Sequence, residues 1–257
     1  MESMILAILQ ARTSSSRLPN KVLRHILGKA MLLYQIERIQ RSKMIDKLVV
    51  ATSTDISDDS LEKLCKDNDV EVFRGNLNNV LDRYYQCANS YKPTHVVRLT
   101  GDCPVIDPRI IDLTIENHLL AESDYTSNTL PPTYPDGLDV EVIKFKILKK
   151  TWKYAKLPSE LEHVTPYIRN HPKIKKFNLK CEKNLSNHRW TVDEREDFDF
   201  IEKIFLKLYP NNNKFDMYDI LDLLKKYPEY KEKNYHIGRN EGAIKSIQQD
   251  ERFLKNV

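Results

Sequence analysis

Three basic side chains lie close together early in this 257-residue sequence. Arg12, Arg17 and Lys21 fall within ten residues, and four hydroxyl residues, Thr13 to Ser16, separate the first two. A hydroxyl-rich loop can aim several backbone N–H groups at one point, and three cations beside it would attract a polyanion, most simply a nucleoside triphosphate. The alternative is a solvated loop with scattered charge.

The segment before this loop favours the first interpretation. Five of the six residues from Met4 to Leu9 are large and apolar, which predicts a strand buried on both faces of a parallel sheet. The cations would then lie beyond the carboxyl end of a core strand, where doubly wound sheets bind ligands. We therefore expect a binding loop.

A carboxylate is expected at the same edge of the sheet. Thr94 to Leu99 has the pattern of another buried strand, and Gly101 and Asp102 follow it closely. Beside a triphosphate a carboxylate is useful through a divalent cation, because direct contact would repel. The alternative for Asp102 is a turn residue that caps a helix beginning near Pro108.

A second carboxylate, Asp193, ends a strand-like run that begins at His188. An amphipathic helix is predicted from Glu194 to Leu208, so Asp193 either caps that helix or reaches a metal ion. Arg189 precedes it on the same run and would lie near an anionic substrate.

Alternating strands and helices must position these side chains. The alternation predicts right-handed βαβ units and a doubly wound, mostly parallel α/β sheet. The predicted elements of the first half are strands Met4–Leu9, Asp46–Thr52, Val70–Phe73 and Thr94–Leu99 and helices Ala30–Lys43, Ser57–Asn68 and Val80–Tyr91.

The second half is predicted to contain shorter elements. Gly137 to Ile143 follows a Pro-rich loop and alternates apolar with acidic residues, so it is either simply half exposed or lines an acceptor pocket. A strand after such a hinge can leave the main sheet and pair with a second subunit, which predicts a homodimer. The other predicted elements are strands Asp124–Asn128 and Lys173–Glu182, a helix over Pro158–His171 interrupted at Pro166, and a helix over Phe215–Lys226.

The first loop, QARTSSSRLPNK, resembles the signature loop of the cytidylyltransferases that activate acidic sugars, of the acylneuraminate and KDO type, and most closely their spore-coat polysaccharide (SpsF-like) branch. The family pattern is Ala-Arg, any residue, Gly-Ser, any residue, Arg-Leu-Pro-Gly-Lys. Ser14 and Asn20 replace its two glycines, and Asn tolerates a left-handed backbone better than most residues. The matching residues are Ala11, Arg12, Ser15, Arg17, Leu18, Pro19 and Lys21.

The resemblance implies roles for particular residues. Gly101-Asp102 matches a metal-holding turn, and Asp193 matches the metal ligand of a Thr-x-Asp-x-x-x-Asp-Phe pattern, which implies Mg²⁺ as cofactor. The implied catalytic residues are Arg12, Arg17, Lys21 and Asp102. The implied nucleotide-binding residues are Ala11, Arg12, Ser15, Arg17, Lys21, Thr52, Arg74 and Asp102, and the implied acceptor-binding residues are Asp136, Asp139, His163, Thr165, Arg169 and Arg189.

Two of these residues have specific expectations. Arg74, at the carboxyl end of the third strand, is predicted to donate to the O2 or N3 atom of cytosine. His163, in a Glu-His-Val-Thr-Pro run, is either a hydrogen-bonded structural residue or a catalyst.

Composition and charge limit the alternatives. A formal net charge of +4 suits CTP and an anionic small-molecule acceptor and does not require nucleic acid. No secretory signal or membrane span is recognised, and four scattered cysteines suggest neither zinc nor disulfides, so a cytoplasmic protein is expected.

The expected domains are a nucleotidyltransferase domain over 1–208, with an inserted acceptor and dimerisation region at 129–182, and a helical C-terminal extension over 209–257. The expected reaction transfers CMP from CTP to an anionic sugar acid or sugar phosphate and releases pyrophosphate, in surface polysaccharide precursor synthesis. The alternatives are a metal-dependent glycosyltransferase and a non-catalytic nucleotide-binding protein. Against the first, Asp197-x-Asp199, which has the spacing of the Asp-x-Asp pair usual in those enzymes, lies on a predicted helix.

Overall fold

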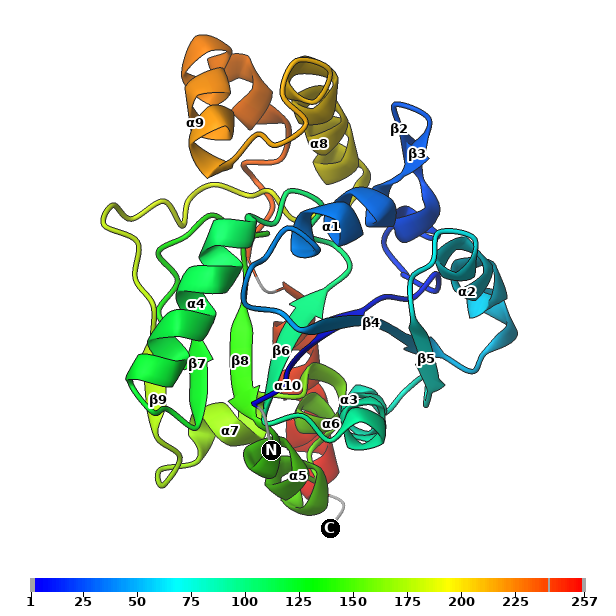
Figure 1. The fold of residues 1–257 in the computed structure, drawn as a ribbon, viewed down its shortest axis with the longest axis vertical. Coiled ribbons are helices and arrows are strands. Elements are labelled where there is room, and N and C mark those ends of the chain that lie inside the picture. The colour runs from blue at the N-terminus through cyan, green and yellow to red at the C-terminus, as the bar shows by residue number, and fades with distance from the viewer. Residues whose placement is uncertain (1–2, 240, 256–257) are drawn as a thin grey trace.

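The computed structural model describes residues 3–239 and 241–255, which form a seven-stranded sheet with helices on both faces (Figure 1). The strand order is β5-β4-β1-β6-β8-β7-β9. Strand β1 (Ile5–Gln10) lies between β4 (Lys47–Ser53) and β6 (His95–Thr100) and is parallel to both. Beyond β4 lies β5 (Val72–Gly75), also parallel. The doubly wound, mostly parallel α/β sheet expected from the sequence is therefore confirmed.

Helices cover both faces of the sheet. Successive side chains of β1 point to opposite faces, and because they are apolar on each face, both faces must be covered. Ile5, Ala7 and Leu9 pack with α1, α2, α4, α8 and α9, whereas Leu6 and Ile8 pack with α3, α5 and α7. The helices are α1 (Met31–Ile39), α2 (Asp59–Lys66), α3 (Val80–Tyr91), α4 (Pro108–Leu120), α5 (Phe145–Tyr154), α6 (Pro158–His163), α7 (Pro166–Asn170), α8 (Arg195–Leu208), α9 (Met217–Lys226) and α10 (Glu241–Lys255).

The strand predicted from Gly137 to Ile143 does not leave the sheet. Its ordered part, β8 (Glu141–Lys144), lies inside the sheet and is antiparallel to both β6 and β7 (Tyr125–Ser127). Val142 and Ile143 are both fully buried, because each face of β8 is covered. The half-exposed interpretation and the pairing with a second subunit through this strand are therefore wrong.

Two further predicted strands need correction. The run from His188 to Asp193 forms no ladder; its backbone N–H groups bond instead to two separate loops, at the carbonyl oxygens of Asp136 and Asp102. The strand predicted over Lys173–Glu182 shortens to the three-residue edge strand β9 (Lys176–Asn178), parallel to β7.

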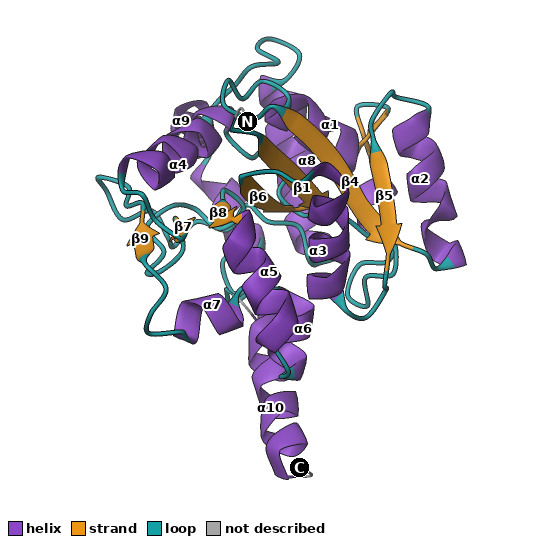
Figure 2. Ribbon diagram, turned by 60° about the horizontal axis from the view of Figure 1, so that its bottom comes forward, coloured by secondary structure: helices purple, strands orange, loops and turns teal. Residues whose placement is uncertain are grey.

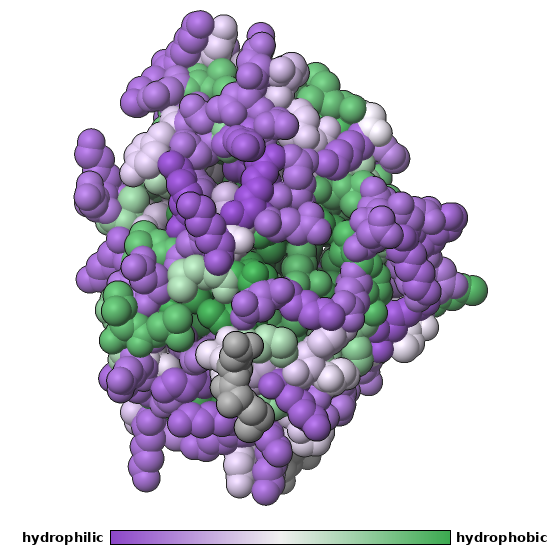
Figure 3. All heavy atoms as spheres, in the orientation of Figure 1, coloured by the Kyte–Doolittle hydropathy of each residue, from purple (hydrophilic) through white to green (hydrophobic). Residues whose placement is uncertain are grey.

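The remaining segments complete the molecule. A small hairpin joins β2 (His25–Ile26) to β3 (Lys29–Ala30), and short 3-10 helices occupy Lys21–Leu23, Ile56–Asp58 and Pro228–Lys233. Helix α10 returns from the α9 region to lie beside α6 and projects away from the sheet (Figure 2). Hydrophilic residues dominate the upper, lower and right-hand parts of the face in Figure 3, and hydrophobic residues gather across its middle. Across the described residues, none of the helices has the length and apolar character needed to span a bilayer.

Candidate active site

The first loop is held in place by a buried aspartate that sequence reasoning missed. Asp58 Oδ1 accepts hydrogen bonds from the backbone N–H and the hydroxyl of Thr13, at 2.7 and 2.8 Å, and Oδ2 accepts from the N–H of Ser53 at 3.1 Å. Burial opposes the charge of Asp58, but these hydrogen bonds prevail and lower the pKa of its carboxyl. No local signal identifies this role, since Asp58 looks like any aspartate at a helix start.

The two departures from the glycine pattern fit the backbone. Asn20 has φ of +57°, in the left-handed region that asparagine tolerates. Ser14 is not among the described residues with positive φ, so its backbone does not require glycine.

Lys21 is the electrostatic centre of the site. Its ammonium donates to Val192 O at 2.7 Å and to Asp193 Oδ1 at 2.9 Å, and lies 3.4 Å from Asp102 Oδ2. Burial would lower the pKa of Lys21, but the two carboxylates outweigh it and raise that pKa. Arg17 reaches the other oxygen of Asp193 at 2.9 Å. The structure thus brings together four of the residues predicted from the sequence.

Asp102 is placed by a close approach of two backbones. The N–H of Gly101 donates to Gln10 O at 2.7 Å, and a Cβ atom at position 101 would lie 2.9 Å from that of Ala11. The carbonyl of Asp102 then accepts from the N–H of Val192 at 2.8 Å, which draws the segment bearing Asp193 against it. Burial would raise the pKa of Asp102, but the neighbouring ammonium lowers it.

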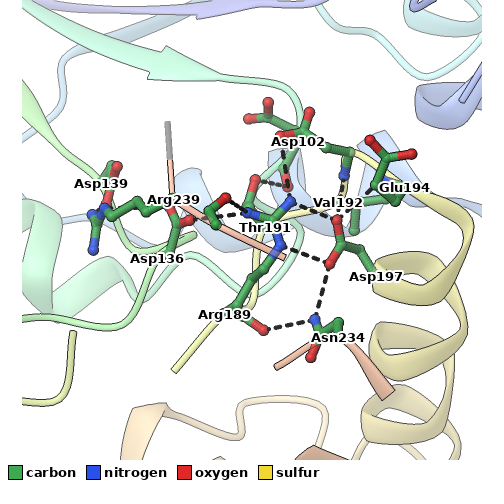
Figure 4. Close-up of polar contacts among 12 residues, drawn as sticks. Asp102, Asp136, Asp139, Arg189, Thr191, Val192, Glu194, Asp197, Asn234 and Arg239 are labelled. Carbon is green, nitrogen blue, oxygen red and sulfur yellow. Dashed lines mark hydrogen bonds and ion pairs between the residues drawn. The ribbon is translucent and has the colours of Figure 1, made fainter. Parts of the chain in front are cut away.

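Arg189, predicted to bind the acceptor, is engaged by a buried carboxylate (Figure 4). Asp197 accepts from the Arg189 guanidinium at 2.9 and 2.7 Å and from Asn234 at 2.9 Å. The same carboxylate accepts from the backbone N–H groups of Asp193 and Glu194, both at 3.0 Å. Asp197 therefore takes the capping role, which leaves Asp193 facing Lys21. Asp197 is the second aspartate of the Thr-x-Asp-x-x-x-Asp-Phe pattern, but sequence reasoning gave it no role, and it missed Asn234.

Asp136 and Asp139 lie on the acceptor side of the site. Gly137, at φ +104°, turns the chain against the backbone of Trp190, where a side chain would have no room. Asp139 Oδ1 accepts from Arg239 at 2.7 Å, and Asp136 lies 3.4 Å from Arg189. Burial and the charge of Asp139 raise the pKa of Asp136 to about 7, although the arginines oppose this.

A second cluster of charged side chains has Glu141 at its centre. Sequence reasoning did not select Glu141 as a site residue. The carboxylate pairs with Arg98 and, at 2.7 Å, with Arg169, and it accepts from the hydroxyls of Tyr125 and, at 2.9 Å, Thr165. Burial opposes its charge, but the two guanidinium groups prevail and lower the pKa of Glu141. Two predicted acceptor residues, Thr165 and Arg169, are thus brought together through this carboxylate.

Two adjoining cavities meet at these residues. A cavity of about 390 Å³ is lined by the first loop, including Ala11, Arg12, Ser15 and Lys21, and we name it the nucleotide cavity. A cavity of about 630 Å³ is lined by Asp136, Asp139, Glu141, Thr165 and Arg169, and we name it the acceptor cavity. The residues that line both are Arg17, Arg98, Thr100, Asp102, His163 and Asp193.

Two predicted nucleotide residues are not brought to this junction. Thr52 is fully buried in β4. Arg74 forms ion pairs with Asp59 and Glu62, at 2.7 and 2.6 Å, and donates to Ser53 O at 2.7 Å. Neither residue lines the nucleotide or the acceptor cavity.

The donor set at the junction fits a hard divalent cation that arrives with a nucleotide. Asp102 and Asp193 supply two carboxylates, and no cluster of three or more His, Cys, Asp or Glu ligands occurs in the described part of the chain. Mg²⁺ is commonly held by one or two carboxylates together with substrate phosphates and water.

Comparison with known proteins shows similarity to cytidylyltransferases over most of the chain. A family model described as cytidylyltransferase matches residues 6–238. The spore coat polysaccharide biosynthesis protein SpsF of Bacillus subtilis is 37% identical over 211 residues, which cover 79% of this chain and 87% of that protein. A 3-deoxy-manno-octulosonate cytidylyltransferase of Anaeromyxobacter dehalogenans is 33% identical over 114 residues, 43% of this chain and 46% of that protein.

A solved structure shows the same agreement in three dimensions. A cytidylyltransferase from Leptospira borgpetersenii superposes with a TM-score of 0.85 at 32% identity, covering 90% of this chain and 97% of that chain. The resemblance seen in the first loop is thereby confirmed over most of the sequence, together with the Rossmann-like nucleotidyltransferase fold. This chain belongs to the cytidylyltransferase family of nucleotidyltransferases.

Proposed function

We propose that the protein transfers CMP from CTP to an anionic sugar acid or sugar phosphate and releases pyrophosphate. The observation that carries this proposal is the junction of the nucleotide and acceptor cavities at Asp102 and Asp193, which are held by Lys21 from the nucleotide side. A phosphoryl group at this junction would face cations on one side and an acceptor on the other. The names of the relatives, one in spore coat polysaccharide biosynthesis and one acting on 3-deoxy-manno-octulosonate, support a role in the synthesis of surface polysaccharide precursors.

The first loop supplies binding of the triphosphate. Arg12 lines the nucleotide cavity and has no ion-pair partner among the described residues, so its guanidinium is available to phosphate oxygens. Arg17 and Lys21 would exchange part of their contact with Asp193 for the same oxygens. These cations also favour departure of pyrophosphate, because its negative charge grows as the bond to the α-phosphorus breaks.

Asp102 and Asp193 would hold Mg²⁺ when the nucleotide is bound. The ion would neutralise charge on the α-phosphate. The protein's own contribution is to hold both carboxylates in place through Gly101 and Asp197, and to align the acceptor oxygen with the α-phosphorus.

The acceptor cavity contains a group with surplus positive charge. Arg98 and Arg169 share the single carboxylate of Glu141. Two guanidinium groups against one carboxylate leave one net positive charge, which suits one carboxylate of an acidic sugar.

A pyrophosphate-release screen of CTP, UTP, ATP and GTP against acidic sugars and sugar phosphates tests this function. We expect release with CTP and at least one acidic acceptor. Arg74→Ala tests the base assignment: because its guanidinium is held by Asp59 and Glu62, we expect the variant to keep the CTP preference. No release with any CTP and acceptor pair would contradict the proposed reaction.

A further inference from the structure

The C-terminal helix α10 lies outside the part of the chain that the family model matches, which ends at residue 238. It does not stand apart from the catalytic domain. Figures 1 and 2 show it beside α6, and these two helices are in extensive contact. Helix α6 carries His163, which lines both cavities.

The contact between α10 and α6 is made by matched polar faces. Ser246 and Asp250 are four residues apart on α10, so they share one face of that helix. Asp250 accepts from the backbone N–H of Ser159 at 2.9 Å and from its hydroxyl, in the first turn of α6. Ser246 contacts Glu162 and His163 at the other end of α6. Helix α10 therefore holds both ends of the short helix that presents His163.

The contacts of Ser246 define which nitrogen of His163 carries a proton. The Ser246 hydroxyl donates its hydrogen to Glu162 Oε2 at 2.8 Å. Its oxygen lies 2.8 Å from His163 Nε2 and must therefore accept from that nitrogen, because a hydroxyl has one hydrogen to give. In a neutral imidazole with hydrogen on Nε2, the lone pair is on Nδ1.

The same helix forms part of both cavity walls. Ser246 and Gln249 line the nucleotide cavity, and Asp250 lines the acceptor cavity. The contacts of α10 thus lie where nucleotide and acceptor meet.

We propose that α10 completes the active site by positioning His163 as the general base for an acceptor that reacts through a hydroxyl group. This inference rests on the proposed function. Nδ1 of His163 takes the hydroxyl proton while the oxygen forms its bond to the α-phosphorus. The bond from that phosphorus to the bridging oxygen breaks, and pyrophosphate leaves with the electron pair. Ser246 and Asp250 are positioning residues, since they act through α6.

The charges of the acceptor cavity favour a hydroxyl over a dianionic phosphate as the reacting group. Among the described residues, seven acidic and four arginine side chains line this cavity. Each arginine has a carboxylate partner, as Arg189 has Asp197, and only Arg98 and Arg169, which share Glu141, leave one positive charge for an acceptor carboxylate. A sugar with one carboxylate and a neutral reacting hydroxyl brings less negative charge into this cavity than a phosphate monoester.

Burial, together with two nearby guanidinium groups, keeps His163 neutral. Burial lowers the pKa of His163, Glu162 and Asp250 raise it, and the guanidinium groups of Arg98 and Arg169 lower it further, with a net shift downward. A neutral imidazole is the form that can accept a proton.

The test combines ring-nitrogen NMR with kinetics. In ¹⁵N-labelled wild-type protein without substrate, the His163 signals, identified by their absence in His163→Gln, should show hydrogen on Nε2 and none on Nδ1. Ser246→Ala should give a mixture of tautomers, and Ser246→Thr should restore the wild-type pattern. Ser90→Ala, a helical serine in α3 that lines neither cavity, is the matched control and should leave the pattern unchanged.

The kinetic arm uses CTP with an acidic sugar that reacts through a hydroxyl. His163→Gln should lower kcat roughly a hundredfold or more, in the range of a lost general base. Ser246→Ala should lower kcat about tenfold with the KM for CTP within about twofold, and Ser246→Thr should recover most of the loss.

Hydrogen on Nδ1 in the wild type would overturn the inference. So would His163→Gln turnover within about threefold of wild type. Neither result affects pyrophosphate release by the wild type, so the proposed function would still stand. A wild type that releases no pyrophosphate with any acceptor would instead overturn the proposed function and, with it, the need for a base.

Discussion

Lys21 and Asp193 form a 2.9 Å ion pair although 172 positions separate them in the chain. The pair closes the site, because Lys21 ends the first loop and Asp193 precedes α8. Asp102, from the turn after β6, joins the same ammonium. One cation thus holds two carboxylates together, and it neutralises part of their mutual repulsion before a nucleotide and a metal ion arrive.

The two carboxylates should behave alike when each is replaced by its amide. Asp102→Asn and Asp193→Asn should each lower kcat by roughly a hundredfold or more and raise the Mg²⁺ concentration needed for half-maximal turnover, because each removes a ligand charge. The fold should survive in both, since Asp197 supplies the hydrogen bonds at the start of α8. Turnover measured against Mg²⁺ concentration checks this. The matched control is Asp199→Asn in α8, because the carboxylate of Asp199 pairs with Arg195 and lies outside both cavities. Wild-type turnover by a folded Asp102→Asn protein at low Mg²⁺ would contradict a ligand role.

Asp197 should be essential for stability. Its fully buried carboxylate is the nearest partner of Arg189, so Asp197→Ala would leave a buried guanidinium with only its longer carboxylate contacts, to Asp136 at 3.4 Å and to Asp193 at 3.6 Å. Removing one member of a buried ion pair costs about 3–5 kcal/mol of unfolding free energy. Urea unfolding followed by circular dichroism measures the loss, with Asp222→Ala, at an exposed position of α9, as the control. A loss below about 1 kcal/mol, the range of an exposed pair, would show that Arg189 finds other partners.

Asp136 should make stability fall as pH rises. Its pKa is raised to about 7 in the folded protein by burial and by Asp139, whereas an unfolded aspartate titrates near pH 4. Between about pH 4 and pH 7 the unfolded chain therefore binds fewer protons, and the contribution of Asp136 to stability declines. Asp136→Asn cannot ionise and should lack this decline. Thermal unfolding midpoints are measured from pH 4.5 to 8.5. The midpoint of the wild type should fall relative to that of Asp136→Asn as the pH rises to about 7. Parallel curves would show that Asp136 is already ionised at low pH.

The protein is expected to be a homodimer, as the family resemblance implies. The strand argument no longer supports this, because β8 lies inside the sheet. Light scattering at micromolar concentration should give twice the chain mass of 30.2 kDa, and a mass near that of one chain would contradict the expectation.

The sequence was most informative where a site residue follows a buried strand. The loop after β1 and the turn at Asp102 both continue from apolar runs, and parallel strands place their carboxyl ends at one edge. Their meeting point could therefore be predicted without knowing any contact. Helix α3 begins at Val80 and ends at Tyr91, as its periodicity indicates.

Residues whose role depends on a distant partner could not be found in this way. Asp58 meets Thr13 across 45 positions, and Glu141 meets Arg98 across 43. The alternating pattern around Glu141 suggested an exposed acidic face, yet two arginines allow its burial. The polar sequence of α10 gave no sign that Ser246 reaches His163, 83 positions away. Tertiary hydrogen bonds and ion pairs of this kind leave no periodicity in the sequence.

The most direct measurement identifies both products formed by the wild type from CTP, Mg²⁺ and an acidic sugar. Mass spectrometry should detect a CMP-linked sugar, and an enzymatic assay should detect one pyrophosphate for each molecule of it, because the acceptor oxygen attacks the α-phosphorus. Asp102→Asn, assayed in parallel, should form both products at roughly a hundredth of the rate or less. Inorganic phosphate with a CDP-linked sugar would place the attack at the β-phosphorus, and free CMP with no sugar adduct would show hydrolysis; either result would contradict CMP transfer.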